Sequence, residues 1–219
     1  MRPLWVLWAL AVTGCASVGV FQQPETLGKG HWQAAAELSS QAQASTDSLS
    51  LYPAFGVAFR YGLTETIDVG AKIGPSGLEA QAKFMLTPRE GVVVSLAPLL
   101  GGTFNMPSGL LFGTAQAALP VLIGVPLSKR VQLVFAPRLH DGLIVLSAGQ
   151  AGGTVNTFSL GGAVGVAVKV KRFQFIPDVG FLAPIATTTW RSDLPSGTVW
   201  GQGRWTFQAN VTVTLGSVR

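Results

Sequence analysis

Eleven polar residues recur on one face of otherwise apolar segments, and their chemistry is the first clue to the protein. They are Glu37, Arg60, Asp68, Lys72, Glu79, Lys83, Arg138, His140, Lys169, Asp178 and Arg204. Charges of both signs in an enclosed space are expected to pair, because an unpaired buried charge is costly. They could also line a conduit. Since six of the ten charged members are cationic, a conduit would prefer anions weakly.

His140 is the member of this set that could act as a general base. Asp141 follows it directly, and Ser147 is a candidate nucleophile nearby in the chain. No sequence pattern ties a nucleophile to this histidine, so a lipid-modifying enzyme is the weakest hypothesis and we predict no catalytic residue. With one cysteine and two histidines in the chain, no metal-ligand spacing is present. We therefore predict no metal and no cofactor.

The elements that position these side chains are predicted to be β-strands. Apolar and polar residues alternate with period two, which places them on opposite faces of a strand. Ten segments show this pattern: 31–39, 51–61, 66–73, 78–86, 92–101, 110–125, 131–140, 155–170, 173–185 and 204–215. One face carries large apolar residues, and the other carries small, polar and charged ones. Five prolines fall inside these segments and predict local irregularities: Pro98, Pro120, Pro137, Pro177 and Pro184.

Two kinds of barrel share this alternation. A soluble, lipid-anchored barrel that binds an apolar ligand would turn its large apolar face inward, whereas an outer-membrane barrel turns that face to lipid. Charged residues are only 11% of the chain, and the mean hydropathy is +0.42, which favours the second kind. Connections after the even-numbered segments are short and most others are long, as in an even-stranded barrel. We predict an all-β, antiparallel, up-and-down transmembrane β-barrel of about ten strands over residues 31–219.

The first residues predict export. Arg2 is followed by an apolar run, Leu4 to Val12, in the outline of a signal peptide over residues 1–14. The sequence Val12-Thr13-Gly14-Cys15 resembles the lipobox of bacterial lipoproteins. This resemblance implies cleavage before Cys15 and attachment of lipid, such as palmitate, to its sulfur. Residues 15–30 would then be a lipidated tether, with the N-terminus on the periplasmic side.

A second resemblance covers the stretch Tyr61-Gly62-Leu63-Thr64-Glu65-Thr66-Ile67-Asp68-Val69-Gly70. It resembles hairpins that recur in small bacterial outer-membrane β-barrel proteins, and the LGKG segment at 27–30 adds to the likeness. The likeness implies a Gram-negative outer membrane, with membrane lipid and the insertion machinery as partners. The chain ends in LGSVR, without the terminal aromatic residue that many such barrels carry. The basic residues form no run with interleaved aromatics, so no nucleic-acid partner is expected. These observations predict a non-enzymatic envelope component, either structural or a narrow porin-like channel.

Overall fold

The computed structural model describes residues 22–216, apart from 45–47, 75–76, 89, 106–109, 149–150, 192–196 and 202. Its strands are β1 (Trp32–Ala44), β2 (Leu49–Gly62), β3 (Ile67–Gly74), β4 (Gly77–Met85), β5 (Val93–Leu96), β6 (Leu99–Asn105), β7 (Leu110–Pro126), β8 (Val131–Ala148), β9 (Ala151–Val170), β10 (Phe173–Arg191), β11 (Gly197–Trp200) and β12 (Trp205–Gly216). No helix among the described residues is long and apolar enough to cross a membrane.

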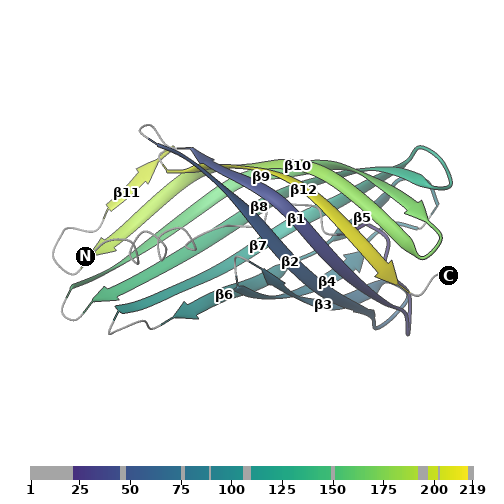
Figure 1. The fold of residues 1–219 in the computed structure, drawn as a ribbon, viewed down its shortest axis with the longest axis horizontal. Coiled ribbons are helices and arrows are strands. Elements are labelled where there is room, and N and C mark those ends of the chain that lie inside the picture. Colours follow the sequence, from purple (N-terminus) through teal and green to yellow (C-terminus); the bar gives the residue numbers. More distant parts are fainter. Residues whose placement is uncertain are drawn as a thin grey trace.

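Neighbouring strand positions pair antiparallel around the sheet, and the sheet closes on itself. β12 pairs with both β1 and β10, and β10 also pairs with β9, which completes the circle (Figure 1). β5 and β6 share one position between β4 and β7, and β11 and β12 share another beside β10. The barrel therefore has ten strand positions, and the predicted all-β, antiparallel, up-and-down barrel is confirmed.

Prolines explain two of the irregularities in the ladder. Pro98 lies between β5 and β6 and separates them. The register between β9 and β10 shifts between Pro184 and Ala186, which marks a bulge. Pro120, Pro137 and Pro177 lie inside strands, where the register continues on either side of them. Because proline has no N–H to donate, these positions remove ladder bonds without opening the barrel.

Two predicted loops are wrong in extent. The prediction left residues 141–154 as a loop, but β8 continues to Ala148 and β9 begins at Ala151. Likewise, β10 continues to Arg191 instead of ending at 185. The run Leu143 to Leu146 is apolar at every position, so it lacks the period-two signal of a strand with two different faces. The two strands instead satisfy their backbone groups by pairing with each other.

The large apolar side chains point outward. Phe55, Phe59, Phe181 and Phe207 are between 46% and 60% exposed, although they belong to paired strands. Trp32 stacks on Phe59 with ring centroids 6.3 Å apart, and Trp205 stacks on Phe207 at the same spacing. Five aromatic residues near strand ends are also outward and exposed: Trp32, Tyr61, Phe84, Phe173 and Trp205. Such an apolar exterior on a closed barrel matches a lipid environment.

Candidate functional site

The barrel interior holds nine of the eleven polar residues that the sequence singled out. Glu37, Arg60, Asp68, Lys72, Glu79, Lys83, Arg138, His140 and Asp178 are each 8% exposed or less. Lys169 and Arg204 are exposed near strand ends and differ from the rest. Without these two, the buried set has four cations and four anions. The excess of cations on which an anion preference would depend is therefore absent from the buried set.

Lys72 is the centre of a charged layer in the middle of the barrel. Its Nζ lies 3.6 Å from Glu37 Oε2 and 3.9 Å from Glu79 Oε1, so the ammonium bridges β1 and β4. Gln208 Nε2 donates to Glu37 at 3.1 Å, and Gln116 Nε2 donates to Glu79 at 3.0 Å. Each carboxylate is thereby held by one cation and one amide. The two carboxylates share one ammonium, and the amide donors help to fix the side chains in place.

Another buried carboxylate belongs to β10, two strand positions from Glu37 on β1. Asn210 Nδ2, on β12, donates to Asp178 Oδ1, on β10, at 2.7 Å. The two residues are directly paired across the strands, which sets the spacing of their side chains. Arg138, on β8, is also buried, at 5% exposure. The interior charges thus come from strands around much of the circumference.

His140 does not form a catalytic group with Asp141. His140 is buried, and its ring Nε2 lies 3.4 Å from Gln116 Oε1. Asp141 is exposed on the opposite face of β8 and accepts a hydrogen bond from Asn156. Ser147 lies seven residues farther along the same strand, which is roughly 24 Å at the rise of a β-strand. Ser147 is therefore out of reach of this histidine, whereas the buried Ser159 of β9 lies directly opposite His140 in the strand register.

The alternation pattern of the sequence did not predict an apolar layer inside the barrel. This layer consists of Ala97, Leu122, Val134, Ala136, Ala163, Ala167 and Ile176, all at most 9% exposed. Along β8 the inward positions run Gln132, Val134, Ala136 and Arg138, so the apolar residues separate the charged layer from the strand's first turn. Ile176 separates Gln174 from Asp178 in the same way on β10. The alternation pattern could have revealed this layer, because Val134 and Ala136 lie on the same strand face as Arg138, and Ile176 lies on the same face as Asp178.

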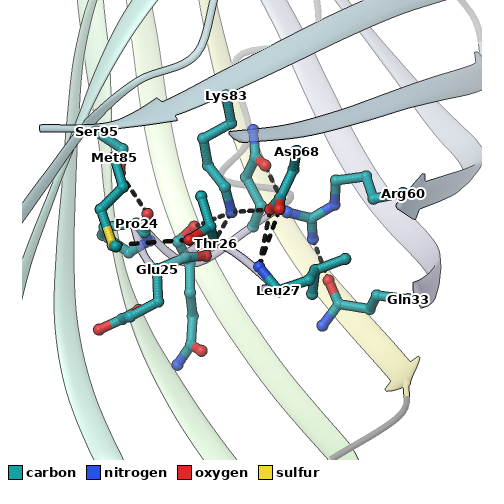
Figure 2. A network of polar contacts seen from close by, with 12 residues as sticks. Pro24, Glu25, Thr26, Leu27, Gln33, Arg60, Asp68, Lys83, Met85 and Ser95 are labelled. Atoms are coloured by element: carbon teal, nitrogen blue, oxygen red, sulfur yellow. Dashed lines mark hydrogen bonds and ion pairs between the residues drawn. The ribbon is translucent and has the colours of Figure 1, made fainter. Parts of the chain in front are cut away.

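The segment before β1 lies inside one end of the barrel. We call this the short-turn end, because it carries the turns at 63–66, 127–130 and 171–172. Leu27 N donates to both carboxylate oxygens of Asp68 at 3.0 Å, and Lys83 Nζ lies 3.1 Å from Asp68 Oδ2 (Figure 2). The same ammonium donates to the carbonyls of Gln23 and Glu25. One buried ion pair therefore binds the segment by its backbone.

Further contacts extend this attachment over residues 22–28. Arg60 donates to Gln22 and Gln33, and Ser95 Oγ donates to the carbonyl of Pro24 (Figure 2). Thr26 Oγ1 donates to the carbonyl of Glu65 at 2.6 Å. Every second residue from Gln22 to Gly28 is buried. Over its described part, the predicted tether at 15–30 is thus a segment bound in the barrel, whereas Cys15 and the predicted signal peptide lie outside the described residues.

Gly62 of the YGLT hairpin makes room for this segment. A Cβ on Gly62 would lie 1.9 Å from the carbonyl oxygen of Gly28, a distance that no side chain tolerates. Gly30 N donates to Gly62 O, and Gly62 N donates to His31 O, both at 2.9 Å. The hairpin motif supplies Gly62 and Asp68, and the LGKG segment supplies Leu27, Gly28 and Gly30. The two stretches that carry the family resemblance are therefore in direct contact.

A cavity of about 330 Å³ lies beside this segment at the short-turn end. It is lined by the turns β7–β8 and β9–β10, by the ends of β8 to β10 and by residues 23 and 25–27. Five of its lining residues are cationic: Lys129, Arg130, Lys169, Lys171 and Arg172. Within the described part of the chain, no cluster of three or more histidine, cysteine or acidic residues could hold a metal ion. The cavity is thus a basic site.

Comparison with known proteins returns likenesses of fold. No protein-family model and no curated protein matches the chain. Among solved structures, neisserial surface protein A is similar at 10% identity and a TM-score of 0.45, over 85% of this chain and 99% of that one. The outer membrane protease OmpT from Escherichia coli is similar at 10% identity and a TM-score of 0.41, over 89% and 98%. A major outer membrane protein from Thermus thermophilus is similar at 13% identity and a TM-score of 0.41, over 85% and 99%. Since these proteins include a protease, the likenesses assign no activity.

Proposed function

We propose that this chain is a lipoprotein of the Gram-negative outer membrane whose barrel is filled and serves as a structural component of the envelope. Cys15 carries the lipid, and the short-turn end faces the periplasm. The barrel conducts no ions in its resting state. The observation that carries the proposal is an interior packed with paired charges and apolar side chains beneath an apolar exterior.

The exterior supports insertion in a membrane. Closed barrels satisfy all backbone hydrogen bonds between strands, which is one of two ways in which a chain can cross hydrocarbon. A strand needs about 9–11 residues to span a bilayer. β8, β9 and β10 have 18, 20 and 19 residues, so they exceed that length and extend beyond the bilayer as hairpins. A soluble barrel that binds an apolar ligand would instead need the large apolar side chains of the strands to point inward, whereas here they are exposed on the outside.

The interior supports a structural role over a conducting one. Lys83, Asp68, Gln41, Thr212 and Thr214 are each 1% exposed or less, although they face the inside of the barrel. Buried apolar residues such as Val134 and Ile176 lie between the charged layer and the short-turn end. A conduit would leave a water-accessible row of polar side chains along the axis. The equal number of buried cations and anions also removes the basis for ion preference.

The test combines a measurement of where the protein is located with a measurement of ion conductance. The full chain is expressed with its own N-terminus, envelope membranes are separated, and gel mobility is compared for unboiled and boiled samples. We expect outer-membrane fractionation, a mobility shift on boiling, and no discrete conductance steps when the purified protein is added to planar bilayers. Reproducible single-channel steps would replace the structural role with a narrow channel. A soluble protein after removal of the lipid would replace it with the binding barrel.

A further inference from the structure

The basic cavity at the short-turn end gathers five cationic residues that the proposed structural role does not explain. Lys129 and Arg130 come from the β7–β8 turn, whereas Lys171 and Arg172 form the β9–β10 turn and Lys169 precedes it. Like charges gathered from two turns repel each other, so an empty cavity of this kind carries an electrostatic cost. Glu25 is the one acidic residue in its lining. Gln132, which also lines the cavity, donates a hydrogen bond from its Nε2 to Glu25 Oε1.

The wall of the cavity also offers a buried donor. Gln174 lines the cavity and is 5% exposed, and its side-chain Nε2 has no hydrogen-bond partner among the described residues. The same holds for two acceptor atoms of the lining, Glu25 Oε2 and Gln132 Oε1. A buried amide donor without a partner costs free energy that a bound acceptor or water would recover. The cavity, at about 330 Å³, lies at the small end of the usual range for ligand sites, about 300–1,000 Å³. Its chemistry therefore fits a compact anion that accepts hydrogen bonds.

We infer that this cavity binds a phosphate-bearing anion, and that its source is the headgroup of an anionic phospholipid. The choice of source rests on the proposed function, which sets the short-turn end at the inner, phospholipid leaflet. Phe173 also lines the cavity and is 48% exposed, so an apolar surface adjoins the cations at the rim. Clusters of four or more Lys and Arg beside a membrane surface are typical of anionic lipid binding. Free phosphate shares the same chemistry and is separated from the lipid by the test.

The test uses the folded full chain in a neutral detergent and measures binding by calorimetry. The probes are short-chain phosphatidylglycerol, short-chain phosphatidylcholine and inorganic phosphate. The variant K169Q/R172Q removes two cations from the cavity. Lys169 N donates to Arg130 O, and Arg172 O accepts from Gly216 N. Because both hydrogen bonds use backbone atoms, the substitutions are expected to preserve the turn. Lys171 is left in place because its φ of 54° makes the turn sensitive to substitution.

The matched control is K29Q/R204Q, which removes the same charge from exposed residues outside the cavity lining. We expect the variant to weaken phosphatidylglycerol binding by roughly fivefold for each lost cation, and the control to leave it unchanged. Phosphatidylglycerol binding without phosphate binding assigns the lipid source. Phosphate binding with the same sensitivity to K169Q/R172Q assigns the free anion.

Three results would overturn the inference. Phosphatidylcholine could bind as tightly as phosphatidylglycerol, the control could weaken binding as much as the cavity variant, or neither anion could bind. Because the folded state is checked by gel mobility in detergent, these results are independent of whether the protein is found in the outer membrane. A barrel that folds and binds the anion but fractionates elsewhere would refute the proposed function and keep the anion site.

Discussion

Lys83 Nζ lies 3.1 Å from Asp68 Oδ2, and both side chains are 1% exposed. This pair joins β3 to β4 and binds the N-terminal segment through Leu27 N and two backbone carbonyls. A buried ion pair stabilises a fold only when hydrogen bonds satisfy its remaining atoms. Here the segment supplies those bonds. The barrel end and the segment are therefore expected to fold and loosen together.

Removing one member of this pair is expected to destabilise the protein strongly. Lys83→Met leaves the Asp68 carboxylate buried without its cation, which costs about 3–5 kcal/mol. Urea unfolding in lipid vesicles, followed by tryptophan fluorescence, measures the loss. The double variant K83M/D68L is expected to lose less than the sum of the two single variants, because the pair is coupled. Additive losses would show that the two side chains act independently.

Gly62→Ala is expected to displace the N-terminal segment. The added Cβ would lie 1.9 Å from the Gly28 carbonyl oxygen, and a backbone atom has little room to move. Thr26 is 3% exposed, so a cysteine placed there in a C15A background reports on release of the segment. We expect maleimide to label T26C at least roughly tenfold faster in the G62A variant, which corresponds to about 1.4 kcal/mol.

The control for this experiment is Gly197→Ala, because a Cβ at Gly197 meets nothing within 4 Å. Equal labelling rates in the G62A and G197A variants would contradict a docking role for Gly62. Retention of the heat-modifiable barrel in both variants would show that the segment closes the barrel end without being required for closure of the sheet.

The central charged layer is expected to respond to Lys72→Met far more than the exposed end responds to Arg204→Gln. Without the Lys72 ammonium, Glu37 and Glu79 are like charges in a buried layer. We expect a loss of about 3–5 kcal/mol for K72M. Arg204 is exposed, and its hydrogen bond to Gln43 is long at 3.4 Å, so R204Q should stay within about 0.5 kcal/mol of the parent. Unfolding in urea compares the two, and similar losses would contradict the division into buried and exposed charges.

His140→Ala is expected to leave envelope lipids unchanged. The histidine is buried beside Gln116, and Asp141 lies on the other face of β8. Mass spectrometry of envelope lipids from cells that express the parent or the variant measures any change in acylation. A lipid product that depends on His140 would establish an enzyme and remove the structural role.

Cys15→Ala is expected to separate lipid attachment from membrane insertion. The proposed lipidation predicts that radioactive palmitate labels the parent chain but not the variant. The apolar exterior of the strands predicts that the folded variant still resists extraction by alkaline carbonate. Labelling of the C15A variant would refute the lipobox assignment. Loss of that variant from the membrane fraction would mean that the lipid, and not the strands, holds the protein there.

Several residues of the candidate site could be predicted from parity, and others could not. Glu37, Lys72 and Arg138 lie on the polar face of their strands, and all three are buried inside the barrel. Lys169 and Arg204 share that parity but lie near the strand ends, where inward-facing positions meet solvent. Parity identifies the face of a strand, whereas depth along the barrel axis depends on where neighbouring strands begin and end.

By itself the sequence determined the strand faces, the antiparallel order and the ten barrel positions, because these follow from local alternation and short connections. Tertiary structure alone decided the contacts of the N-terminal segment. Its partners Arg60, Asp68, Lys83, Ser95 and Gln132 are 38 to 107 residues away in the chain. The tertiary structure also places Val134 of β8 and Ile176 of β10 in one apolar layer with residues of other strands. Closing a sheet places residues from distant strands around one axis, and no period along a single strand encodes which of them will meet.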